Sequence, residues 1–453
     1  MNLWVLPSLA QEGVFTLEQA QQYAIENHLN AKNAQLDIDY SKKQVFETTT
    51  IGLPQVNGVI NYQNFIDIPT QVAPAEAFGF PDEINTIIAK SAQLYNLPLP
   101  EQPENNFSEL QFGTQHNASA GLTINQLIFD GSFLVGLKAA KVYVDLSRKQ
   151  KIQTETEISH NVAKAYYTAL ITEENLTILK KNVTLLQKTH YETSEMLKNG
   201  FVEKLDVDRL TLTLSNLETQ QKNLERQAIL SKELLKFQMG MAPNQEITLS
   251  DSIKLLTNNL ASTLEPTIDF NKRIEYQSLG IQLELARLNI QRYNANLLPS
   301  LGAFFNHSQN AYRDGFDFLG SEGKWYPSTV VGIQMNIPLF NLRNMALKQQ
   351  AMIDREKINN SKMYLERAIT IEVTGAQINY NNAVASLETQ KGNMKLAKEI
   401  YETTGIKYKE GVGSSLEVTN AQTELYKTQT NYINSLYDLL NAKSDLDKAL
   451  GVN

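Results

Sequence analysis

The chain has 453 residues, of which 42% are hydrophobic and 20% are charged, a composition that excludes an intrinsically disordered protein. The net charge of −8, without a basic cluster interleaved with aromatic residues, argues against a nucleic-acid partner. Cysteine is absent, which excludes disulfides, thiolate zinc sites and a cysteine nucleophile.

The N-terminus holds the one candidate for a targeting segment. Residues 1–11 are mostly apolar, and Ala10 is a small residue that suits a signal-peptidase cut, although the usual basic region in front is missing. We interpret residues 1–13 as a signal-peptide remnant. The alternative is an ordinary frayed N-terminus.

Long helices are predicted wherever proline is missing. No proline occurs between Pro103 and Pro243 or after Pro338, and proline breaks helix interiors. A shorter helix is predicted from Thr16, which with Gln19 resembles a capping box, to about residue 50. A helix from residue 132 to residue 199 would span roughly 100 Å.

Four strands are predicted from alternating polarity, at about 54–65, 118–130, 299–308 and 329–340. The first two flank residues 66–116, which hold six prolines, seven acidic residues and one lysine. We expect this segment to be a long loop, because it is too rich in proline for a core element.

The chain is duplicated. The hairpin tip at Gly200 recurs at Gly411, 211 residues later, whereas the Leu-Pro pairs in front of the first and third strands lie 245 residues apart. The difference places 34 extra residues in the first hairpin loop. Residues 14–240 and 267–453 are therefore expected to be two copies of one supersecondary unit, joined by a linker at 241–266.

Strands of this length, with one apolar face, suit a bilayer-spanning barrel. A sheet in a membrane must close, and four strands cannot close alone, so several copies would share one barrel. The alternative is a soluble β-layer.

The doubled helix–hairpin–helix pattern, with Gly tips, resembles the TolC-like outer-membrane efflux proteins over residues 14–453. Two further sequences carry the same resemblance: Asn-Gln-Leu-Ile-Phe-Asp-Gly at the end of the second strand and Asn-Ile-Pro-Leu-Phe-Asn at the end of the fourth. The resemblance implies a mainly α fold with a small membrane β part, in a homotrimer. Its 12-strand β-barrel would continue into a periplasmic α-helical barrel, with residues 66–116 extracellular.

The same resemblance implies a function and partners. The chain would sit in the outer membrane of a Gram-negative bacterium, in contact with outer-membrane lipid, with most of its length in the periplasm. It would serve a periplasmic adaptor and an inner-membrane pump as the exit duct of a tripartite efflux or type I secretion system. Because the pump selects the transported substrate, the resemblance does not identify that substrate.

Three residues match the family's periplasmic gate by position. Asp206 lies six residues after the first tip glycine, Tyr408 lies three before the second, and Glu417 lies six after it. They would be a gate acid, its tyrosine partner and a constriction carboxylate. The chain departs from the family at Gly413, where an arginine is common. The alternative for both acids is a first-turn acid favoured by a helix N-terminus.

The resemblance also implies that the hairpin tips meet the adaptor. Apolar side chains at an exposed turn favour a partner surface over a bare loop. The expected tip residues are Gly200, Phe201, Val202, Gly411, Val412 and Gly413.

An aromatic pair, Trp325 and Tyr326, precedes the fourth strand and suits a membrane-interface belt.

No enzyme is predicted. The five histidines show no metal spacing, no nucleophile or phosphate-binding motif is present, and no cofactor is expected. The competing hypothesis is a soluble periplasmic coiled-coil scaffold or adaptor, in which the strands form a small β-domain.

Overall fold

The computed structural model describes residues 13–74, 82–98, 107–257, 267–318, 320 and 323–452. The expected signal-peptide remnant therefore lies outside the described residues, except for Gly13. The chain divides into two compact units. The helical unit is formed by the described parts of residues 1–45, 136–291 and 345–453, and the strand unit by those of 46–135 and 292–344.

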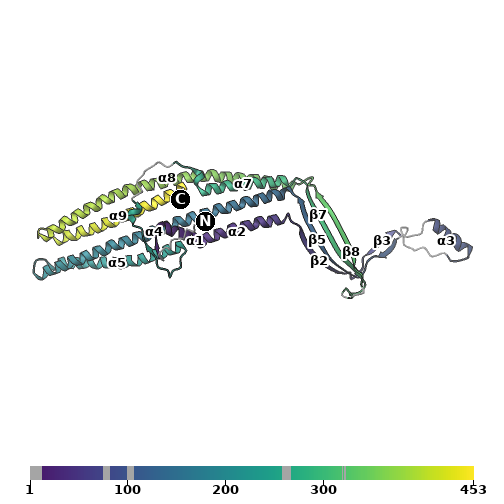
Figure 1. Cartoon of the computed structure of the whole chain (residues 1–453), viewed down its shortest axis with the longest axis horizontal. Helices are drawn as coiled ribbons and strands as arrows, with labels where there is room; N and C mark the ends of the chain where they lie inside the picture. Colours follow the sequence, from purple (N-terminus) through teal and green to yellow (C-terminus); the bar gives the residue numbers. More distant parts are fainter. Residues whose placement is uncertain are drawn as a thin grey trace, which may run out of the picture. The chain divides into compact units, whose positions relative to one another are not determined.

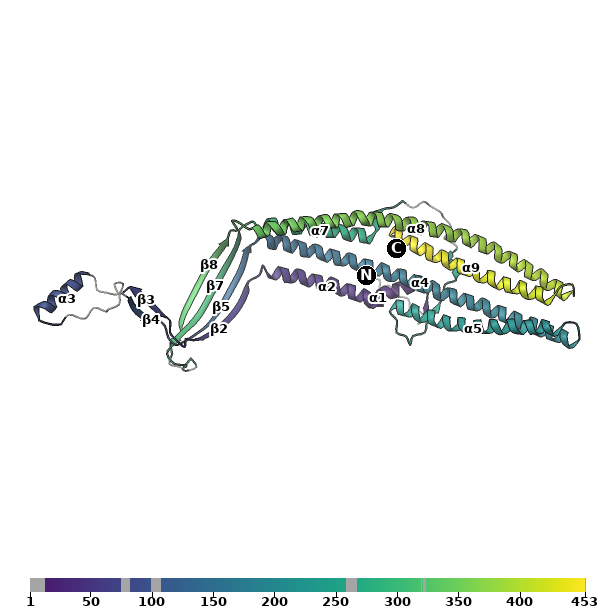
Figure 2. The same cartoon turned by 180° about the vertical axis from the view of Figure 1, so that it is seen from behind.

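Helices dominate the chain (Figure 1). The long ones form two antiparallel hairpins, α4 with α5 and α8 with α9, which both views show side by side (Figures 1 and 2). Among the described residues, no helix combines the length and apolar character required to cross a membrane. The helices are α1 (Leu17–Asn27), α2 (Leu29–Thr50), α3 (Asp82–Leu94), α4 (Gly131–Lys198), α5 (Lys204–Met239), α6 (Ile253–Thr257), α7 (Ile274–Ala295), α8 (Leu342–Lys409) and α9 (Ser415–Leu450), with a 3-10 turn, η2 (Phe270–Lys272), before α7.

The helix bounds repeat with the offsets seen in the sequence. The helices α4 and α8 both have 68 residues, α5 and α9 both have 36, and each pair is shifted by 211 positions. The helices α2 and α7 both have 22 residues and are shifted by 245.

The predicted first helix is in fact two. Thr16 forms the expected capping box with Gln19, but α1 ends at Asn27 and α2 begins at Leu29, because His28 between them has an extended backbone (φ −64°, ψ 134°). The physical reason lies in another part of the chain. A Cβ on Gly240, which ends α5, would lie 2.8 Å from the His28 Cα, so the end of α5 abuts the start of α2.

The second repeat has the same junction. A Cβ on Gly451, after α9, would lie 2.7 Å from the carbonyl oxygen of Lys272, just before α7. In both repeats the C-terminus of a returning helix therefore meets the N-terminus of a short helix. This contact brings opposite ends of two helix dipoles together, which is favourable.

The main core of the helical unit lies where α1, α4, α5, α6 and α9 meet. Tyr166 of α4 is fully buried there. Its hydroxyl donates to Asp251 Oδ2 over 2.9 Å, and the same carboxylate oxygen accepts the backbone N–H of Leu17 over 2.7 Å. The segment between the repeats is thus tied to α1 and α4, and a two-residue β1 (Val14–Phe15) pairs with its β6 (Thr248–Leu249).

The strand unit contains a four-stranded antiparallel sheet in the order β2-β5-β7-β8. Pairing runs from Gln55↔Asn125 to Asn64↔His116 and from Ser300↔Asn336 to Asn310↔Tyr326, with a bulge between Leu127 and Phe129. Its strands are β2 (Gln55–Asn64), β5 (His116–Phe129), β7 (Ser300–Arg313) and β8 (Tyr326–Asn336).

Two strand predictions need correction. The third strand runs five residues past the predicted 308, because β7 keeps pairing with β5 as far as Arg313. The fourth begins three residues before the predicted 329 and ends at Asn336, four residues before 340, because Pro338 has no N–H for a ladder.

Residues 66–116 are more than a loop. β3 (Thr70–Pro74) and β4 (Phe107–Gln111) pair as an antiparallel ribbon, and the amphipathic α3 lies between them in sequence. We call residues 70–111 the insertion, since the second repeat has no counterpart. The proline content concealed these elements at the sequence level, because the described prolines lie at their borders: Pro69 precedes β3, Pro74 ends it and Pro98 follows α3.

Candidate functional site

The two hairpin tips are built alike. The Phe201 N–H donates to the Met196 carbonyl over 2.9 Å, and the Val412 N–H donates to the Lys407 carbonyl over 3.0 Å. Gly200 and Gly411 have φ values of 76° and 77°. This is the Schellman ending, in which a left-handed glycine lets the backbone satisfy the last helix carbonyls.

Each tip exposes an apolar side chain. Phe201 is 77% exposed and Val412 is 78% exposed, whereas Val202 is half-buried. Gly413 is a tight fit, since a Cβ there would lie 3.0 Å from the Tyr408 nitrogen. A side chain at this position would therefore require the end of α8 to shift by a few tenths of an ångström.

Asp206 links the two hairpins. The Ser415 hydroxyl, at the start of α9, donates to Asp206 Oδ1, and Ser415 is buried. The other Asp206 oxygen accepts the Glu203 N–H over 3.3 Å at the start of α5. Asp206 therefore acts both as a first-turn acid and as a bond between α5 and α9.

Tyr408 links the hairpins a second time. Its hydroxyl lies 3.1 Å from Thr193 Oγ1 of α4 and 3.9 Å from the Met196 sulfur. Thr193 has no exposed surface, so this hydrogen bond is shielded from water. Tyr408 therefore ties α8 to α4.

Asp206 and Tyr408 are not hydrogen-bonded to each other among the residues that the structure describes. Each bridges the hairpins through a partner that the sequence did not indicate, Ser415 and Thr193. We call these four residues the latch. A serine or threonine is too common in helices to signal such a role, and both partners lie more than 200 residues away from the residues they bind.

Glu417 is placed differently. Its backbone N–H is capped by Ser414 Oγ at 3.2 Å, but its side chain is exposed. Within the described part of the chain, its carboxylate makes no hydrogen bond or ion pair. It is a free negative charge next to the latch.

Further side-chain hydrogen bonds, between amides and between hydroxyl groups, join the hairpins along α4 and α9. Asn182 of α4 donates to Gln429 of α9 over 3.1 Å, and Thr168 lies 3.2 Å from the Tyr437 hydroxyl. Such directional contacts fix the register of two helices.

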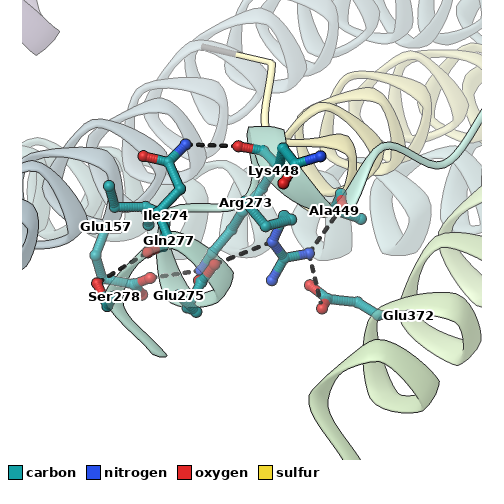
Figure 3. A network of polar contacts seen from close by, with 10 residues as sticks. Glu157, Arg273, Ile274, Glu275, Gln277, Ser278, Glu372, Lys448 and Ala449 are labelled. Carbon is teal, nitrogen blue, oxygen red and sulfur yellow. Dashed lines mark hydrogen bonds and ion pairs between the residues drawn. The ribbon is translucent and has the colours of Figure 1, made fainter. Parts of the chain in front are cut away.

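A polar cluster lies at the junction of α9 and α7 (Figure 3). Buried Arg273 donates to Glu275 over 3.1 Å, to Glu372 over 3.0 Å and to the Ala449 carbonyl over 2.8 Å. Its pKa is raised by the two carboxylates, although burial opposes this. Arg273 therefore ties α7, α8 and α9 together and satisfies a carbonyl in the last turn of α9.

The aromatic pair at the start of β8 contacts further aromatic side chains, and its place at a membrane interface stays a prediction. Trp325 precedes β8 and Tyr326 begins it. The Trp325 ring centroid lies 6.4 Å from that of Phe318, and the Tyr326 centroid lies 6.4 Å from that of Tyr312. Tyr62 joins Phe316 and Phe318 at the same end of the sheet.

Among the described residues, no group of three or more histidine and acidic side chains could hold a metal ion.

Comparisons with known proteins show which proteins this architecture resembles. Residues 275–452 match the family model "Outer membrane efflux protein". The outer membrane protein TolC of Vibrio cholerae is 21% identical over 338 residues, 74% of this chain and 76% of that protein. The toluene efflux pump outer membrane protein TtgC of Pseudomonas putida is 20% identical over 346 residues, 75% of this chain and 69% of that protein.

Solved structures share the fold. CusC, a transmembrane channel, matches with a TM-score of 0.71 and 16% identity over 99% of this chain and 97% of its own. The outer-membrane channel OprN matches with a TM-score of 0.70 and 14% identity over 96% and 90%. The second repeat of the chain is thus similar to the outer membrane efflux protein family, and the whole chain shares its fold with outer-membrane channels.

Proposed function

We propose that the chain is the outer-membrane exit duct of a tripartite efflux or type I secretion system. It would conduct substrates passively from the periplasm, or from a pump, to the outside. Three copies would form the duct, with a gate at the hairpin tips.

The observation that carries this proposal is that both edge strands of the four-stranded sheet have an unpaired outer edge among the described residues. The order β2-β5-β7-β8 leaves β2 and β8 without an outer partner among the described residues. Because all three pairings are antiparallel, the two edge strands run in opposite directions. The β2 of one copy can therefore pair with the β8 of the next and continue the antiparallel pattern. Three copies would give 12 strands without an edge, which a membrane requires.

The helices offer matching lateral surfaces. Large apolar side chains are exposed on α2, α5 and α8, a pattern that favours burial against another copy. They include Leu36 (64%), Tyr40 (66%), Phe237 (70%), Tyr364 (75%) and Ile371 (74%).

The latch supports the gate. Its two contacts hold one hairpin of a chain against the other near the tips. Separation of the hairpins would break both hydrogen bonds, each of which contributes a net stabilisation of about 1 kcal/mol. Glu417 adds a negative charge beside the latch, and a threefold assembly would turn it into a ring that attracts cations.

The exposed Phe201 and Val412 support the tips as the surface that meets a periplasmic adaptor, through which the duct would reach an inner-membrane pump. The names of the relatives refer to different substrates, such as toluene or antibiotics. We therefore propose no particular substrate for this chain, because its pump would determine it.

The proposal is tested with the full-length protein expressed in a Gram-negative host. It should sediment with outer membranes and run as a heat-sensitive trimer of three 51.0 kDa chains. Purified trimers should conduct ions in a planar bilayer. Extraction as a soluble monomer would instead support the periplasmic scaffold.

A further inference from the structure

A large cavity of the helical unit lies beside the two helix junctions and measures about 1110 Å³. We call it the junction cleft. Its walls come from the starts of α2 and α7, the middle of α4, and the ends of α5 and α9. The volume is at the upper end of the range of small-molecule sites.

The lining of the junction cleft is cationic, although the whole chain carries a net charge of −8. Four cations and two acids line it: Lys149, Lys272, Arg273, Lys448, Glu157 and Glu275. A cleft with an excess of one charge concentrates the field inside it and attracts ions of opposite sign.

Both acids are already engaged (Figure 3). Glu275 accepts from Arg273 over 3.1 Å, and Glu157 pairs with Lys448, which lowers the pKa of Glu157. Within the described ranges, the other two lysines of the cleft, Lys149 and Lys272, therefore have no acidic partner.

The first of these lysines, Lys149, donates over 2.8 Å to Gln277, a neutral amide of α7. The second, Lys272, is exposed, and its ammonium group makes no ion pair with any residue the structure describes. An anion could form ion pairs with both lysines without breaking an existing ion pair. Exchange of the Gln277 amide for an anion would make the Lys149 hydrogen bond stronger, since both partners would then be charged.

We propose that the junction cleft binds a ligand that carries at least two acidic groups, either carboxylate or phosphate. Lys149 and Lys272 would be its principal counter-ions. The side-chain amides along α4, such as Gln150 and Gln153, would offer neutral hydrogen bonds to the rest of the ligand. This site lies in the helical unit and does not depend on conduction through the duct.

Isothermal titration calorimetry on the purified full-length protein tests the site, with citrate and pyrophosphate as separate probes at constant ionic strength. We expect saturable binding of at least one probe below about 1 mM. Binding of citrate alone would assign carboxylate ligands, and binding of pyrophosphate alone would assign phosphate ligands.

The variants compare two pairs of lysines. K149Q/K272Q should weaken binding at least about tenfold. K391Q/K398Q is the matched control, because these α8 lysines are exposed and pair only within their own helix, and it should bind as the wild type does. The single charge reversal K272E, at an exposed position, should also weaken binding even if the double variant does not fold.

Two results would overturn the site. One is no saturable binding of either probe up to about 10 mM. The other is equal weakening in the two double variants, which would indicate an adventitious ion only. Bilayer conductance of the same preparations is measured separately, so a failed duct and an empty cleft give different results.

Discussion

Four left-handed glycines end the four long helices, and their surroundings divide them into two kinds. Gly200 and Gly411, at the tips, have no atom within 4 Å of an added Cβ. Gly240 and Gly451, at the junctions, would meet backbone atoms at 2.8 and 2.7 Å. All four need a positive φ, but only the junction glycines also need the missing side chain.

This difference predicts unequal costs for the same substitution. G200A should lower stability only by the strain of a left-handed residue, about 1–2 kcal/mol. G240A should cost clearly more, because the methyl group must push α5 away from His28. Apparent melting temperatures of the two variants in detergent give the comparison. Equal shifts would show that the close approach does not matter.

His160 makes stability depend on pH. Its Nδ1 lies 3.1 Å from Ser444 Oγ and its Nε2 lies 3.2 Å from Asp445 Oδ1. Burial lowers the pKa of His160, Lys448 and Lys164 lower it further, and Asp445 and Glu157 oppose them. The folded state therefore binds fewer protons at this residue than the unfolded state.

A folded pKa below the unfolded value gives stability that is present above about pH 6.5 and lost as the pH falls. The wild type should thus lose melting temperature between about pH 7.5 and pH 5.5, and H160Q should lose less. The control H190Q removes a half-buried histidine whose Nε2 lies 3.0 Å from Thr211 Oγ1, away from this cluster, and it should follow the wild type. The role of His160 would be refuted by parallel curves for H160Q and the wild type.

At the scale of helices, the latch predicts the leak of the closed duct. S415A/Y408F removes one hydroxyl from each contact between the hairpins, so resting ion conductance in planar bilayers should rise several-fold. Y401F is a matched control, since Tyr401 lies two turns earlier on α8 and its hydroxyl makes no hydrogen bond within the described chain. If the double variant conducts no more than the control, the latch has no role in closing the gate.

The sequence predicted elements better than contacts. Proline-free runs, the Gly200 and Gly411 tips and the 211-residue offset were enough to place the long hairpins, because helix length and periodicity are local properties. The break at His28 could not be predicted, since no proline or glycine lies there and its cause is Gly240. Thr193, Ser415 and Arg273 were missed for the same reason, as each acts through a helix distant in sequence.

At the scale of the molecule, the insertion is expected to be dispensable for assembly. In the described parts of the chain, its strands β3 and β4 pair with each other and with no other strand, and the second repeat connects β7 to β8 in 12 residues without it. A chain in which a short Gly-Ser linker replaces residues 70–111 should therefore still form trimers with wild-type conductance.

The measurements are the heat-sensitive trimer band and the bilayer current. The same linker in place of residues 243–257 is the control, because it removes the segment whose Asp251 binds Tyr166 and Leu17, and it should abolish the trimer band. Loss of trimers in the first deletion would assign the insertion a role in assembly.

The equal helix lengths of the two repeats constrain how such a chain can evolve. Deletion of one residue turns the rest of a helix by about 100°. In α4 such a deletion would shift Thr193 away from Tyr408 while α8 stayed unchanged. Length changes in the long helices are thus tolerated only as matched events in both repeats, whereas loops vary freely. This rule accounts for two observations. One loop is longer by 34 residues in the first repeat, whereas the helices of 68 and 36 residues have the same length in both repeats.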